Sequence, residues 1–177
     1  MSRGNWSTKD VREAREIDVL RLENDVLPLW LQEQQSRFSE WVQEIGGVWD
    51  FSPESLDRLE AVVRERYKVQ AEFRNQEAEP FLQVAAWYLG EVHNRYRGTQ
   101  WQVHPDAKGR HRWKWYPFVI PAWDRVDDYE DEDGIDYDAR PIVEPLNSLQ
   151  AIVLEPYERP EPGQSLRDEL DAYETKG

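Results

Sequence analysis

The chain has 177 residues, a net charge of -14 at pH 7 and no cysteine. This length suits one domain with a sizeable core, which nine Trp, eight Tyr and five Phe can fill without disulfides or a structural metal. The composition excludes thiol chemistry and zinc ribbons, and the negative charge argues against nucleic acid or an anionic bilayer as the main partner.

Two amphipathic segments open the predicted fold. Ser7 or Thr8 can cap a first helix that runs to about Val26, although Asp18 interrupts its apolar side. A second helix follows Pro28 and ends at Gly46-Gly47. Its apolar positions recur at helical spacing: Leu31, Phe38, Trp41, Val42 and Ile45.

The next two segments have clearer starts. Ser52 stands where an N-cap belongs and Pro53 occupies the first helical position, so a third helix is expected here. Pro80 then opens a segment from Phe81 to Trp101 whose apolar residues occupy nearly its whole circumference, and Gly98 marks its end. This segment is the predicted central helix of the core.

Short aromatic and β-branched runs follow. Trp101 to Val103 predicts a strand, Asp106 to Gly109 a turn, and the alternating residues Arg112 to Trp115 a second strand of a hairpin. Phe118 to Ile120 is a short strand or the end of the preceding one.

The C-terminal third carries further apolar runs. Pro141 to Pro145 is one of them, and Ser148 to Leu154 fits either a helix or extended chain against the sheet. Glu155 to Gly163 is too rich in proline for regular structure, and Ser165 with Asp168 can cap a last short helix that docks through Leu166, Leu170 and Tyr173. The expected fold is α+β, with three to four N-terminal helices on a small antiparallel sheet. Residues 1–154 form the domain and 155–177 a connector with a docking helix.

Candidate catalytic groups are sparse. Glu91, His93 and His104 are the polar residues that a pocket between helices and sheet would use, but they match no metal-ligand or nucleophile motif. His104-Pro105-Asp106 is the tripeptide of J-domain co-chaperones, yet the flanking segments differ from that domain, so a proline turn is expected. Glu91 is expected to pair with Arg95, and a catalytic Glu91 with a raised pKa is the alternative.

The densest negative charge lies between Asp124 and Asp138. An EF-hand alignment on Gly134 places Tyr129 first and Arg140 twelfth, so the calcium motif fails at both ends. A solvated acidic loop is expected, with weak binding of a divalent ion as the alternative. Its expected use is to attract a basic protein partner.

Cations and tryptophans alternate just before this loop, from Lys108 to Trp115. On a neutral protein this pattern is typical of stacking on single-stranded nucleic acid. Here the neighbouring carboxylates are expected to neutralise it.

Two segments, Asp50 to Val63 and Ala85 to Trp101, resemble a group of small uncharacterised actinobacterial proteins in which a YLGEV-like helix enters a Gly-containing turn and a Trp-bearing strand. The resemblance implies an α+β fold and carries no activity or site residues. In size and charge the chain is also similar to acidic immunity proteins of bacterial toxin systems.

The sequence therefore predicts a non-catalytic, immunity-like or regulatory domain that binds a basic protein partner. No cofactor is expected, and the alternatives are a small enzyme and a self-associating protein. The N-terminus lacks an apolar targeting segment and no stretch is long enough to span a membrane, so a cytoplasmic protein is expected. The candidate contact residues are Trp113, Trp115 and Trp123 as anchors, with Asp127, Asp128, Glu130, Asp131 and Asp133 as the steering group.

Overall fold

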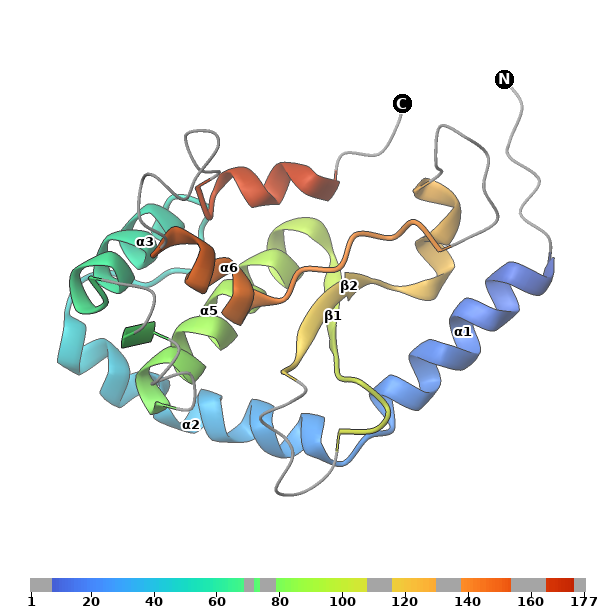
Figure 1. Cartoon of the computed structure of the whole chain (residues 1–177), viewed down its shortest axis with the longest axis horizontal. Helices are drawn as coiled ribbons and strands as arrows, with labels where there is room; N and C mark the ends of the chain where they lie inside the picture. Colours follow the sequence, from blue (N-terminus) through green and yellow to red (C-terminus); the bar gives the residue numbers. More distant parts are fainter. Residues whose placement is uncertain are drawn as a thin grey trace.

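The computed structural model describes residues 8–68, 72–73, 79–107, 116–129, 138–153 and 165–173. It confirms an α+β fold in which helices surround a small antiparallel sheet (Figure 1). The elements in chain order are α1 (Thr8–Leu22), α2 (Val26–Ile45), α3 (Ser55–Arg66), α5 (Pro80–Arg97), β1 (Thr99–Gln102), β2 (Phe118–Pro121), the 3₁₀ helix η2 (Trp123–Asp128), α6 (Pro145–Ile152) and the 3₁₀ helix η4 (Asp168–Tyr173).

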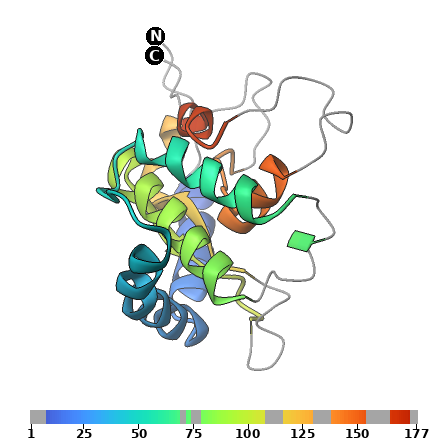
Figure 2. The same ribbon diagram turned by 90° about the vertical axis from the view of Figure 1, so that its left-hand side faces the viewer.

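Helix α5 is the centre of the core, as its sequence predicts. All residues from Phe81 to Gly90 are buried. Helix α2 packs along one side of α5, while α6 and η4 pack elsewhere on it (Figures 1 and 2). Gly98 ends the helix in the left-handed conformation, with φ of 67°, which glycine adopts without steric cost.

An aromatic cluster around Tyr88 joins α5 to the loop between α2 and α3. The Tyr88 ring lies 4.7 Å from that of Phe51 and 5.1 Å from that of Trp49. Its hydroxyl accepts a hydrogen bond from the Phe51 backbone N–H at 2.9 Å and donates one to Ser55 Oγ at 2.7 Å. These contacts hold Phe51 at φ of 60°, a conformation that bulky residues rarely adopt.

The predicted end of the first helix was wrong. Helix α1 ends at Leu22, and Val26 instead begins α2. Asn24 explains the break, because its Oδ1 accepts the Val26 N–H at 2.9 Å. Its amide nitrogen also donates to the carbonyl of Ala107 at 2.9 Å, so one side chain starts α2 and holds the turn that follows β1.

The partner of β1 is β2, with Thr99 opposite Pro121 and Gln102 opposite Phe118. The predicted second hairpin strand, Arg112 to Trp115, lies outside the described residues. Val119 of β2 also exchanges backbone hydrogen bonds of 2.9 and 3.0 Å with Val143. The sheet is thus extended by a bridge, and the chain from Pro145 to Ile152 is helical rather than extended.

The predicted docking of the C-terminal helix is confirmed. Ser165 N–H donates to Asp168 Oδ2 and Asp168 N–H donates to Ser165 Oγ, both at 3.1 Å, which is a reciprocal cap. Leu166, Leu170 and Tyr173 are all buried against the body of the domain. The helix is 3₁₀ in form, and the predicted connector from Glu155 to Gly163 lies outside the described residues.

Candidate partner-binding surface

Helix η2 presents its carboxylates to solvent because its other side is anchored. Val126 and Tyr129 are buried beneath it. Asp124, Asp127 and Asp128 are exposed. The sequence prediction that acidic residues are solvated here therefore holds for Asp124, Asp127 and Asp128, whereas Asp138 at the end of the run is hydrogen-bonded to Arg140.

A half-buried tryptophan adjoins these carboxylates. The guanidinium of Arg15 in α1 lies 5.3 Å from the centre of the Trp123 ring, within the range of a cation–π contact. On the helix, Val19 and Leu22 follow Arg15 at positions i+4 and i+7 and share its side of α1. Both are unusually exposed for apolar residues, at 41% and 42%.

We call Trp123 and the charged residues around it the α1–η2 surface. It combines a partly exposed indole ring, on which the Arg15 guanidinium lies, with an acidic edge. Its members are Arg15, Trp123, Asp124, Asp127 and Asp128.

Arg125 fixes η2 to the end of α5. Its Nη1 donates to the Arg97 carbonyl at 2.9 Å, and its Nε donates to Asp128 Oδ2 at 3.1 Å. The charge of Asp128 is therefore partly compensated. Among the described residues no cation forms an ion pair with Asp124 or Asp127, so these two carboxylates contribute most to the local negative field.

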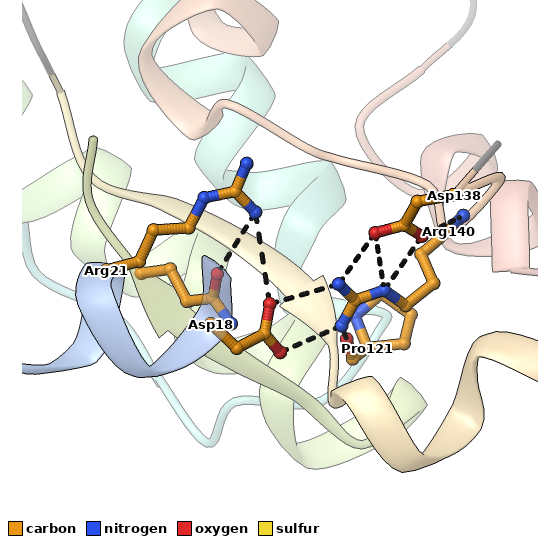
Figure 3. Close-up of polar contacts among 6 residues, drawn as sticks. Asp18, Arg21, Pro121, Asp138 and Arg140 are labelled. Carbon is orange, nitrogen blue, oxygen red and sulfur yellow. Dashed lines mark hydrogen bonds and ion pairs between the residues drawn. The ribbon is translucent and has the colours of Figure 1, made fainter. Parts of the chain in front are cut away.

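A buried ion-pair network holds α1 against β2 immediately before η2 (Figure 3). Arg140 donates to Asp18 of α1 through both terminal nitrogens, at 2.9 and 3.0 Å, and to the Pro121 carbonyl at 2.8 Å. The side chains of Asp18 and Arg140 are both fully buried. Asp138 accepts the remaining bonds of the guanidinium, including one of 2.7 Å from Nη2.

Arg140 and Asp138 keep their charges despite the burial of the network. Burial disfavours the charged form of Arg140, but its hydrogen bonds to Asp138 and Asp18 outweigh that effect and raise the pKa of Arg140 above its ordinary value. Burial acts against the Asp138 carboxylate as well, yet its hydrogen bonds to Arg140 lower the pKa of Asp138. The position of α1 beside η2 therefore rests on hydrogen bonds between Asp18 and a guanidinium that keeps its charge.

Only part of the predicted contact set can be placed. Trp123, Asp127 and Asp128 lie together on η2. Trp113, Trp115, Glu130, Asp131 and Asp133 lie outside the described residues. The contribution of Arg15 was missed in the sequence, where the pattern of α1 predicts an ordinary core helix. The one available signal was Asp18, since an acid within an apolar stripe indicates a buried cation elsewhere in the chain.

The residues of the alternative enzyme site have separate structural partners. Glu91 accepts a hydrogen bond from Trp101 Nε1 at 2.8 Å and lies 3.8 Å from Arg95. His93 is fully buried, with Nδ1 3.0 Å from the Tyr173 hydroxyl.

His104 belongs to a turn. The Ala107 N–H donates to the His104 carbonyl at 2.9 Å, and the Asn24 amide binds this carbonyl as well. The expected proline turn is confirmed. The contacts of these three candidate residues therefore give each a structural role.

Within the described part of the chain, no group of three or more His, Cys, Asp or Glu residues is arranged to hold a metal ion. The helices described here also include none with the length and apolar character needed to cross a membrane. No protein-family model, curated protein or solved structure matches the chain.

Proposed function

We propose that this protein is a non-catalytic binding domain whose α1–η2 surface receives a basic segment of a protein partner. The observation that carries the proposal is the placement of Asp124 and Asp127, exposed and without an ion pair among the described residues, beside the half-buried Trp123. Aromatic rings of this kind are frequent anchors of interfaces, and carboxylates around them favour Lys and Arg in the partner.

The charge of the whole chain supports the same partner chemistry. A net charge of -14 gives a long-range attraction for cations, which raises the rate of encounter with a basic protein. An immunity-like or regulatory role would use this surface to cover a basic patch. The chain has no cysteine and so gives no indication of an oxidising compartment, and the proposal places the protein in the cytoplasm. Membership of the actinobacterial group remains a prediction.

Binding of synthetic peptides tests the proposal. We expect 15-residue peptides rich in Arg and Lys to bind in a fluorescence-anisotropy titration, and Glu-rich peptides of the same length to show no binding. Asp124→Asn with Asp127→Asn is expected to weaken binding about five- to thirtyfold, because each exposed ion pair contributes about 0.5–1 kcal/mol.

The matched control changes the net charge equally at a distance from the surface. Glu40→Gln in α2 with Glu65→Gln in α3 removes two exposed carboxylates and should change the affinity less than twofold. Equal weakening by both double variants would show that net charge alone attracts the peptide. That result would remove the α1–η2 surface as the binding site.

A further inference from the structure

The C-terminal segment Ser165–Tyr173 is attached to the domain mainly by side chains. Leu166 and Leu170 are buried, and the Leu166 N–H donates to Glu60 Oε2 of α3 at 3.2 Å. Its far end is fixed to α5 by the Tyr173 hydroxyl at His93 and by the ion pair of Asp171 with Arg97, at 3.1 Å. The segment therefore spans α3 and α5, as Figure 1 shows for the red helix.

Two ionisable groups lie where this segment meets the body: His93 of α5 is fully buried, and Glu169 of η4 is half-buried with its Oε2 shielded from solvent. His93 Nδ1 bonds to Tyr173, but among the described residues its Nε2 has no hydrogen-bond partner. The buried Oε2 of Glu169 has none either. An imidazolium needs acceptors for both N–H groups and a carboxylate needs donors to both oxygens, so these contacts suit the uncharged form of each.

The charged neighbours act in the same direction. Burial, with Arg97 next to the ring, lowers the pKa of His93 to about 4. Burial raises the pKa of Glu169 to about 7, and Glu60 of α3 adds to this effect while a hydrogen bond from Ser148 of α6 opposes it. Three further ionisable residues lie around the contact between η4 and α5: Tyr173, Tyr129 and Asp171.

We propose that Ser165–Tyr173 is a releasable latch, which docks only when His93 and Glu169 are both uncharged and whose release exposes the sides of α3 and α5 that it now covers. The latch is a property of the fold and does not depend on the proposed partner.

The two groups are expected to compensate each other. When the segment is released, His93 of α5 and Glu169 of the segment are expected to regain their ordinary pKa values of 6.5 and 4.5. Between these two pH values both groups are then charged in the released state and neutral in the docked state. Docking then moves a proton from His93 to Glu169 without net uptake. Across pH 4–7 the need to neutralise the two groups makes the docking equilibrium about a hundredfold less favourable than docking without a change of protonation, and this factor is almost independent of pH.

Replacing either group alone should make docking of the segment depend on pH, in opposite directions for the two substitutions. In Glu169→Gln only His93 titrates, and its lowered pKa means that docking weakens as pH falls from 7 to 4, by about a hundredfold. In His93→Asn only Glu169 titrates, and its raised pKa means that docking weakens as pH rises from 4 to 7 by a similar factor.

Hydrogen exchange of the amides of residues 166–173, corrected for intrinsic rates, measures docking in the full chain. We expect a nearly constant protection factor in the natural protein from pH 4 to 7, and slopes of opposite sign in the two variants. The amides of α5 should stay protected in all three proteins, which separates release of the latch from global unfolding.

Tyr173→Phe is a third variant that keeps the ring and both titrating groups. Loss of one hydrogen bond should lower the protection of the segment about fivefold at every pH. Variant slopes of the same sign, flat profiles in both, or protection of the segment equal to that of α5 would each overturn the proposal.

Discussion

Asp18 and Arg140 form the most deeply buried charged contact described in this protein, across 122 positions of sequence. Such a pair contributes little net stability over a well-packed apolar pair, because both charges lose their hydration. Removal of one partner has a much larger effect, since it leaves the other charge buried without compensation.

Arg140→Leu is therefore expected to lower the free energy of unfolding by about 3–5 kcal/mol, measured by urea denaturation. The exposed pair of Arg37 and Glu33, 2.8 Å apart, provides the control, and Arg37→Leu should cost at most about 1 kcal/mol. The double change Asp18→Leu with Arg140→Met should recover much of the loss. A cost below about 1 kcal/mol for Arg140→Leu would show that the pair does not hold α1 in place.

Gly90 allows the indole ring of Trp101 to approach α5 closely. A Cβ at this position would lie 2.2 Å from two carbons of the indole ring. The ring has little freedom to move, because Glu91 binds its nitrogen and Trp30 packs on it with ring centres 5.1 Å apart.

Gly90→Ala is accordingly expected to destabilise the protein, although alanine is the better helix former by about 1 kcal/mol. Overpacking costs about 1–3 kcal/mol, so we expect a net loss of up to about 2 kcal/mol in urea unfolding. In a Trp101→Leu background the same change should become neutral or stabilising. Stabilisation by Gly90→Ala alone would contradict the packing described here.

At the level of elements, helix ends were predicted well where a capping residue or a glycine marks them in the sequence. Gly46 and Gly98 end α2 and α5 where the sequence places these ends, and the reciprocal cap at Ser165 forms as predicted. The boundary at Asn24 was missed although its signal is local, because Asn24 Oδ1 accepts the Val26 N–H two residues on, a contact typical of Asn at turns and helix starts. Only the second contact of Asn24, with the turn more than 80 positions away, is absent from local patterns.

The same limit applies to the candidate site. The sequence predicted the acidic residues and Trp123 because they are neighbours in the chain. It could not predict that Arg15 stacks on Trp123, or that Arg140 reaches Asp18, because both contacts depend on how α1 packs against the sheet. Asp18 consequently appeared as a defect in an amphipathic helix and is in fact the anchor of that helix.

At the scale of the whole molecule, the end of α5 joins the candidate surface to the C-terminal latch. Arg97 accepts a hydrogen bond from Arg125 of η2 through its carbonyl and binds Asp171 of η4 through its side chain. The two features remain separable by experiment, because Asp124 and Asp127 lie on η2 whereas His93 and Glu169 lie at the contact between α5 and η4.

The central claim is that the acidic α1–η2 surface attracts a basic partner, and the rate of association measures it most directly. We would follow binding of a labelled Arg-rich peptide by stopped flow from about 20 to 200 mM salt, comparing the natural protein with Asp124→Asn/Asp127→Asn and Glu40→Gln/Glu65→Gln. Salt screens exposed charges over about 10 Å, so the association rate of the natural protein should fall steeply with salt. The η2 variant should associate more slowly at low salt and the control should not. Two results would contradict this claim: an association rate of the natural protein that does not change with salt, or an equal reduction of the low-salt rate in the η2 variant and in the control variant.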